Sequence, residues 1–504
     1  MDSCLFYSLQ FFLFCVLTIT LYLSYKSKPS HDNPIPKTYP YLGNLPEFIK
    51  NRHRFLDWST HIISNIPNNT FIFRRPGKVQ GVITANPLNV EHMLKTNFLN
   101  YPKGERVRYL LKDFLGKGIF NSDGDLWKVQ RKVASHEFST RSLRNFVIEN
   151  VQLELKTRLI PLLSNASVSN KVIDIQDFLE RFAFDNVCKV AFNVDPACLG
   201  GDGTSGTAFM KAFEDAATLS AGRFMYAFPS FWIFKRFCNI GSEKVLKDSR
   251  NIVHEFAEKI IESRMTEKET GEKADLLSRF ISVNDHNSLK SLNYLRDVVI
   301  SFILAGRDTT SSALSWFFWL LASKPDVERK ILQELQSIRI SSGKSVGEIY
   351  ELDELRQMHY LHAAISEAMR LYPPVAVDTK KCQDDDIMPD GTFVAKGWFV
   401  TYHTYAMGRM ENIWGKDCNE YIPERWIQNG TFQPENPFKY PVFHAGPRMC
   451  LGKDMAYIQM KSIAACVIEK FEMDVIDKGT RPEHVLSLTL RMKNGLMVRM
   501  KERF

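Results

Sequence analysis

The stretch that decides the fold is Phe443-His444-Ala445-Gly446-Pro447-Arg448-Met449-Cys450-Leu451-Gly452, which stands directly before a helical pattern that begins near Asp454. The amino end of a helix has unpaired N–H groups and a positive potential, and both lower the pKa of a nearby thiol. Cys450 is therefore predicted to be an anionic metal ligand. Gly446 allows close approach of the backbone, and Phe443 can cover the sulfur. Arg448 is placed to meet an anion beside that ligand.

A cysteine at a junction between a loop and a helix is more often inert and buried, because free cysteine packs as a small hydrophobe. The defined positions of this stretch match instead the pattern F-x-x-G-x-R-x-C-x-G, and the chain resembles the cytochrome P-450 superfamily over nearly its whole length. The resemblance implies a mainly α fold with small β sheets and a bound haem b. It also implies that Cys450 is the axial thiolate of the iron and that Phe443, Gly446 and Arg448 bind the cofactor.

A second motif, Ala305-Gly306-Arg307-Asp308-Thr309-Thr310, lies within the apolar run Val298–Leu321. A glycine inside a helix costs about 1 kcal/mol, and a threonine hydroxyl there can bond a carbonyl one turn earlier, so a local distortion is expected. Alternatively, Asp308 could cap a new helix that starts at Thr309. The resemblance implies an oxygen-binding groove in which Asp308 and Thr309 are catalytic and deliver protons.

Glu367 and Arg370 stand at positions i and i+3 of a predicted helix, where their side chains can pair. Such pairs usually lie on solvated faces and contribute little to stability. The resemblance implies instead a buried network of Glu367, Arg370 and Arg425 that supports the haem-binding core.

Trp127 and Arg131 are separated by one helical turn, which by itself indicates only an amphipathic helix. In the family that the chain resembles, this pair contacts the haem propionates, so Trp127, Arg131 and Arg448 are candidate cofactor-binding residues. The neighbouring Lys128 and Lys132 are candidates for a basic face that receives an NADPH-cytochrome P-450 reductase, the implied electron donor.

The 504 residues have a net charge of +8, with basic and acidic residues interspersed, so a nucleic-acid partner is poorly supported. The nine cysteines form no C-x-x-C pair and no zinc-like spacing. Most of them are expected to be reduced, buried thiols in a cytosolic domain.

The amino terminus has no charged residue from Ser3 to Tyr25, which is long enough to span the ~30 Å core of a bilayer. The start of a cleaved signal peptide would be basic, whereas here Asp2 precedes the run, so residues 1–28 are predicted to be a transmembrane anchor. Lys26 and Lys28 place the remaining chain in the cytosol, on the endoplasmic reticulum membrane. Residues 29–45 are predicted to be a proline-rich hinge, and residues 46–504 a haem-binding monooxygenase domain.

The β signals are a hairpin from Thr70 to Thr84, a turn around Pro389-Asp390-Gly391, and a segment from Leu486 to Met500 around Asn494-Gly495. Helical periodicity covers Asp125–Glu154, Glu243–Thr266, Leu292–Ala322, Leu361–Leu371 and Asp454–Phe471.

Three stretches are similar to the plant fatty-acid omega-hydroxylase branch: residues 118–124, 305–310 and 405–410. The resemblance implies hydroxylation of the terminal (omega) methyl end of a long lipid chain held end-on in an apolar channel. Segments Val107–Phe120 and Leu371–Val377 are the expected walls. A fatty acid is the leading substrate, with a steroid side chain or jasmonoyl-isoleucine as alternatives. A haem carrier or sensor is the non-enzyme alternative, which does not need Asp308 and Thr309.

Overall fold

A computed structural model describes residues 36–75, 79–138, 150–200, 206–226, 228–267, 275–282 and 291–503. Residues 38–504 form one compact unit. The predicted anchor, residues 1–28, and the first part of the predicted hinge, residues 29–45, lie outside the described ranges. Within those ranges, no helix combines the length and the apolar composition needed to cross a membrane.

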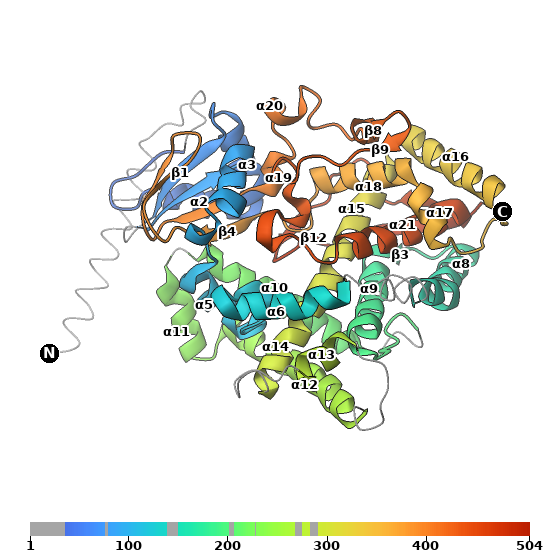
Figure 1. Cartoon of the computed structure of the whole chain (residues 1–504), viewed down its shortest axis with the longest axis horizontal. Helices are drawn as coiled ribbons and strands as arrows, with labels where there is room; N and C mark the ends of the chain where they lie inside the picture. The colour runs from blue at the N-terminus through green and yellow to red at the C-terminus, as the bar shows by residue number, and fades with distance from the viewer. Residues whose placement is uncertain are drawn as a thin grey trace. The chain divides into compact units, whose positions relative to one another are not determined.

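The unit is mainly helical, as predicted (Figure 1). Its larger helices are α2 (Leu45–Asn51), α3 (Phe55–Ser64), α5 (Gly104–Leu115), α6 (Gly124–Phe138), α8 (Ile160–Val168), α9 (Ile175–Phe192), α10 (Thr207–Gly222), α11 (Pro229–Phe237), α12 (Gly241–Glu267), α13 (Leu276–Ser282), α14 (Leu292–Ile303), α15 (Thr309–Ala322), α16 (Pro325–Ser342), α17 (Leu352–Gln357), α18 (His359–Leu371) and α21 (Lys453–Lys470). Shorter ones are α4 (Pro87–Glu91), α19 (Thr404–Met407) and α20 (Glu411–Trp414).

The described strands form small sheets. The largest has the order β1 (Thr70–Arg75), β2 (Val79–Thr84), β7 (Phe399–Tyr402), β4 (Asp378–Lys381), in which only the pairing of β2 with β7 is parallel. A second sheet has the order β10 (Phe471–Val475), β13 (Met497–Glu502), β3 (Ile173–Asp174). Two-stranded pairs are β5 (Asp386–Ile387) with β6 (Phe393–Val394), β8 (Ile427–Gln428) with β9 (Thr431–Phe432), and β11 (His484–Leu486) with β12 (Leu490–Met492).

Most predicted elements are confirmed. The hairpin at Thr70–Thr84 is β1 with β2, and the turn at Pro389-Asp390-Gly391 joins β5 to β6. The predicted helices correspond to α12, α14 with α15, α18 and α21. The predicted helix Asp125–Glu154 begins as α6, and part of its remaining length lies outside the described residues.

The predicted β segment around Asn494-Gly495 is confirmed, since it contains strands β12 and β13. Its favoured turn does not join these strands into a hairpin, because they belong to different sheets. The cause is a competing partner: Asp174 accepts a hydrogen bond from the Leu496 N–H at 2.9 Å, and Leu496 accepts one from the Ile175 N–H at 3.0 Å. These bonds attach the chain after Gly495 to β3 and the start of α9, so β13 pairs with β3 and not with β12.

The run α14–α15 crosses the middle of the unit (Figure 1). It is apolar almost all round, which is typical of a helix buried in the core of a large domain. Its α15 portion packs against α9, α18 and α21, and its α14 portion against α5 and α12. This central helix therefore contacts α21, the helix that follows the loop of Cys450. It also shares one apolar cluster with α5, α10 and α12.

Candidate functional site

The loop that contains Cys450 is closed by two backbone hydrogen bonds. The Cys450 N–H donates to the Phe443 carbonyl at 2.8 Å, and the Met449 N–H donates to the Gly446 carbonyl at 3.0 Å. Gly446 has a φ of +65°, and a Cβ at this position would lie 2.0 Å from the Leu94 carbonyl oxygen. Only glycine therefore suits this turn, and α21 begins three residues after Cys450.

The Cys450 side chain is solvent-accessible, whereas Cys188, Cys382, Cys418 and Cys466 are buried. Protein packed around the sulfur nevertheless desolvates it, and this effect raises the pKa of the thiol above its usual value. A hydrogen bond from the Gly452 backbone and the charge of Arg131 act in the opposite direction but are smaller. The predicted net lowering of this pKa by the helix end was wrong, because desolvation outweighs it. A bound metal ion would favour the thiolate over the thiol.

Trp127, Arg131 and Arg448 lie together beside this loop. The Arg131 Nη2 donates to the Met449 carbonyl at 2.7 Å. The guanidinium of Arg448 lies 4.4 Å from the centre of the Trp127 ring, and that of Arg131 lies 5.9 Å from it. Arg448 Nη2 donates to Asp123 at 2.8 Å, but its Nε is buried without a hydrogen-bond partner among the described residues. An incoming anion would satisfy that donor, so this group of residues fits a haem propionate.

Sequence reasoning missed a second charged group beside the loop. The buried Asp378 carboxylate accepts hydrogen bonds from Lys103 at 2.6 Å and Lys380 at 2.7 Å, and it lies 3.0 Å from His444 Nε2. Burial lowers the pKa of Lys380 to about 7 although Asp378 raises it. The segment Asp378-Thr379-Lys380-Lys381 carried no clear signal of this group, because lysines on an edge strand such as β4 usually face solvent.

Thr309 lies at the end of a π-helical turn, Leu304–Asp308, that interrupts the central helix between α14 and α15. Its hydroxyl donates to the Ala305 carbonyl at 2.5 Å, which is the predicted back-bond. A Cβ on Gly306 would lie 2.5 Å from the Val187 side chain, so glycine lets α9 approach the widened turn. The expected distortion is therefore confirmed, and π turns of this kind are frequent at functional sites.

Asp308 does not cap a helix: its backbone is helical, and its side chain accepts no capping hydrogen bond. The carboxylate instead pairs with Arg307 at 2.8 Å, and Arg307 in turn pairs with Glu180 at 3.1 Å. Arg491 binds the same Glu180. Burial raises the pKa of Asp308 to about 6, while the charge of Arg307 acts to lower it. Sequence analysis did not assign a role to Arg307, although a charge inside an apolar run was a signal.

Glu367, Arg370 and Arg425 form one network behind the cysteine loop. Glu367 and Arg370 are fully buried and share two hydrogen bonds of 2.8 Å. Arg425 Nε lies 3.3 Å from the same carboxylate, which also accepts hydrogen bonds from the Trp426 indole at 2.9 Å and the Ile422 N–H at 3.0 Å. Such a network is costly to break, because removal of one member leaves a buried charge unpaired.

Phe138 connects the cysteine loop to the central helix. Its ring stacks on Phe302 of α14 with centroids 6.5 Å apart, and a Cβ on Gly452 would lie 3.5 Å from its edge. The structure thus brings Cys450, Arg131, Arg448 and Trp127 into one group and Asp308 and Thr309 into another, with Phe138 in contact with the loop of the first and the helix of the second.

Comparison with known proteins agrees with this geometry. Residues 34–498 match the family model described as Cytochrome P450. The chain is 52% identical to cytochrome P450 CYP94D108 of Paris polyphylla over 95% of this chain and 93% of that protein. It is 45% identical to cytochrome P450 94A2 of Vicia sativa over 95% of this chain and 94% of that protein. It is 46% identical to cytochrome P450 94B1 of Arabidopsis thaliana over 93% of this chain and 91% of that protein. The family predicted from the cysteine loop is confirmed.

Proposed function

The chain belongs to the cytochrome P450 family and is a monooxygenase of that family, and from this premise we propose that it hydroxylates the terminal methyl end of a long-chain fatty acid. The supporting observation concerns residues 118–124, a stretch similar to the plant omega-hydroxylases. A Cβ on Gly118 would lie 2.0 Å from Ser301 Oγ on α14, and the Ser122 carbonyl accepts a hydrogen bond from Arg448 at 3.1 Å. The stretch therefore touches both the central helix and the loop of Cys450.

Cys450 is the proposed thiolate ligand of a haem b iron. Trp127, Arg131 and Arg448 would hold the propionates, while Phe443 and Gly446 shape the loop around the sulfur. The haem, when bound, supplies activation of O2 with electrons that come from NADPH through a reductase. Glu367, Arg370 and Arg425 act as a structural support for this loop.

Thr309 and Asp308 are the proposed proton-handling residues. The Thr309 hydroxyl lies at the end of the π turn, where it can exchange its bond to the Ala305 carbonyl for one to a reacting oxygen. The Asp308 carboxyl group has a pKa of about 6, so both its protonated and its ionised forms are accessible near neutral pH. Arg307 holds this carboxyl group in place.

Regioselectivity would follow from end-on binding. The side chains of α14 in the central helix and of the neighbouring α5, α9 and α10 form one apolar cluster, which excludes water and suits a hydrocarbon chain. Each methylene group contributes only about 1 to 3 kcal/mol to discrimination, so several chain lengths should be accepted.

The test is a substrate panel. The enzyme is reconstituted with a plant NADPH-cytochrome P450 reductase and offered a long-chain fatty acid, jasmonoyl-isoleucine and a side-chain-hydroxylated sterol in parallel. Terminal hydroxylation of the fatty acid supports the proposal. Turnover of the sterol alone would show that the substrate is a steroid side chain and not a fatty acid. Oxidation confined to mid-chain or ring carbons would rule out end-on binding.

We also propose that residues 1–28 anchor the enzyme in the endoplasmic reticulum membrane with the catalytic domain in the cytosol. The uncharged run from Ser3 to Tyr25 and the basic residues that follow it support this orientation. For the reductase, α6 offers a docking face next to the site: the Lys128 side chain is 65% exposed, and Arg131 of the same helix bonds Met449.

A further inference from the structure

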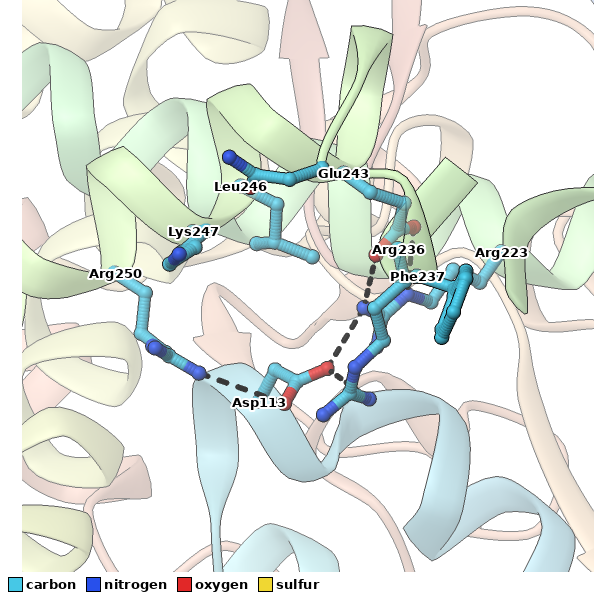
Figure 2. A pocket seen from close by; sticks show the side chains of 9 residues that line it. Asp113, Arg223, Arg236, Phe237, Glu243, Leu246, Lys247 and Arg250 are labelled. Atoms are coloured by element: carbon cyan, nitrogen blue, oxygen red, sulfur yellow. Dashed lines mark hydrogen bonds and ion pairs between the residues drawn. The ribbon is translucent and has the colours of Figure 1, made fainter. Parts of the chain in front are cut away.

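A cavity of about 310 Å³ lies between the end of α5, helix α11 and the start of α12, away from the cysteine loop. Figure 2 shows Asp113 between Arg250 on one side and Arg223 with Arg236 on the other. The charged residues that line it are Asp113, Arg223, Arg236, Glu243, Lys247 and Arg250. Four cations therefore face two carboxylates, and the cavity has an excess of positive charge.

The carboxylates do not use up the available donors. Arg223 is fully engaged, because it pairs with Asp113 at 2.7 Å and with Glu243 at 2.5 Å. Arg236 and Arg250 share the same Asp113, at 3.0 Å and 3.7 Å, and Arg250 Nε is buried without a hydrogen-bond partner in the described part of the chain. Lys247 forms no ion pair with any described residue. One more oxyanion can therefore be bound here.

The half-buried His254 of α12 has a lowered pKa, chiefly because of burial and secondarily because of neighbouring positive charge. Burial, and then the charges of Arg296 and Arg250, lower the pKa of His254 to about 4, although Asp113 acts to raise it. Arg296 near the start of α14 pairs with Glu258 of α12 at 3.1 Å, and its neighbour Asp297 accepts a hydrogen bond of 2.8 Å from the Lys117 N–H just after α5. Two of the elements that line the cavity, α12 and the end of α5, therefore also contact this end of the central helix. From Arg296 to Thr309 the helix extends roughly 20 Å at 1.5 Å per residue. An extended long acyl chain can span that distance.

The lining is also amphipathic. Leu246 and Phe237 contribute apolar surface to the cavity. The volume is at the lower end of small-molecule sites, so it suits a head group with the first carbons of a chain and not a whole lipid. The paired N–H groups of a planar guanidinium match the two oxygens of a carboxylate.

We propose that this cavity binds the carboxylate of the acyl substrate, with Arg236, Lys247 and Arg250 as specificity-determining residues, while the far end of the chain lies near Thr309. The inference rests on the proposed function and narrows it. Acids with a long apolar chain, fatty acids or acyl amino acid conjugates, are recognised, and a neutral sterol has no group for this site.

The experiment compares a long-chain fatty acid with its methyl ester, because the two differ only in the charged head group. The holoenzyme, reconstituted with reductase, is assayed as parent, as Arg236→Gln with Lys247→Gln, and as Lys244→Gln. Lys244 is the matched control, since it is an exposed lysine on α12 that does not line the cavity. Values of kcat and KM are measured for both substrates.

We expect the double variant to raise KM for the acid roughly tenfold, as for the loss of one charge-assisted hydrogen bond, without a comparable fall in kcat. The ratio of acid to ester kcat/KM should fall by the same factor, and Lys244→Gln should keep the parent ratio. An equal effect on acid and ester overturns the inference while terminal hydroxylation stands. A parent that hydroxylates neither compound overturns the proposed function as well.

A membrane phosphate is the other source of an oxyanion at this position. Binding of parent and double variant to phosphatidylcholine vesicles with and without phosphatidic acid separates the two sources. If the double variant loses affinity for the acidic vesicles but keeps the parent ratio of acid to ester, the cavity binds lipid head groups and the inference is wrong. Unchanged vesicle binding with an altered ratio supports the inference.

Discussion

Arg307 Nη1 donates a hydrogen bond of 2.8 Å to the carboxylate of its own neighbour, Asp308, and Arg307 Nη2 is 3.1 Å from Glu180. Adjacent residues on a regular α-helix point in different directions, so this contact depends on the π turn that ends at Asp308. The same turn that opens the helix at Thr309 thus also brings an acid and a base together inside an apolar segment.

Asp308 should make stability depend on pH. Its pKa is about 6 in the folded protein, against an ordinary value of 3.8, chiefly because of burial. Between these two pKa values the folded state keeps the Asp308 carboxyl proton, whereas the unfolded state has lost it. The contribution of this group to the free energy of unfolding is therefore present at low pH and is lost as pH rises through 6. Between about pH 4.5 and pH 7 the free energy of unfolding of the parent should fall by about 2 kcal/mol relative to that of Asp308→Asn. Urea midpoints of both proteins measure this. Parallel pH curves would refute it, because other titrating groups affect both proteins equally.

Thr309→Ala should retain haem and substrate binding but divert electrons to peroxide, so product formed per NADPH consumed should fall several-fold. Thr309→Ser, which keeps the hydroxyl, should restore most of the coupling. Ser311→Ala is the matched control, because Ser311 donates a similar hydrogen bond to the Arg307 carbonyl at 2.7 Å one turn earlier. Equal coupling in Thr309→Ala and parent would remove Thr309 from the mechanism.

Cys450→Ala should abolish the thiolate-type Soret band of the reduced carbonyl complex, and Cys450→His should give a different axial ligand. The spectrum is the readout, and it does not depend on turnover. Cys382→Ala and Cys418→Ala should keep the parent band, because both thiols are buried elsewhere. A parent-like band in Cys450→Ala would assign the ligand to another residue.

Arg370→Ala should destabilise the protein by about 3 to 5 kcal/mol and reduce the haem-bound fraction, because Glu367 would remain buried and charged without its partner. Arg356→Ala is matched to it by spacing: Arg356 pairs with Asp353 at i,i+3 and 2.9 Å, but these side chains are 58% and 86% exposed. That variant should change the free energy of unfolding by no more than about 0.5 kcal/mol. Similar losses in the two variants would contradict a supporting role of the buried network.

Deletion of residues 1–30 should release the protein from microsomes without loss of haem, since the anchor precedes the compact unit that begins at Thr38. Membrane sedimentation and the carbonyl spectrum measure the two properties on the same sample. Protection of the catalytic domain from added protease in intact microsomes would reverse the proposed orientation.

The sequence by itself determined the family and the local structure around its motifs. The loop at 443–452 needs glycine at one position of positive φ and a cysteine just before a helix, and both requirements are visible in the residue types. The back-bond of Thr309 and the pairing of Glu367 with Arg370 follow from helical spacing, so they too could be predicted.

Only the tertiary structure decided which long-range partners compete for each group. The bonds from Asp174 separated two strands that a favoured turn should have joined, and burial reversed the predicted shift in the pKa of Cys450. The excess of positive charge around Asp113 was equally invisible, because its cations come from three segments that meet only in the fold. Local propensity depends on neighbours in the chain, whereas desolvation and charge pairing depend on neighbours in space.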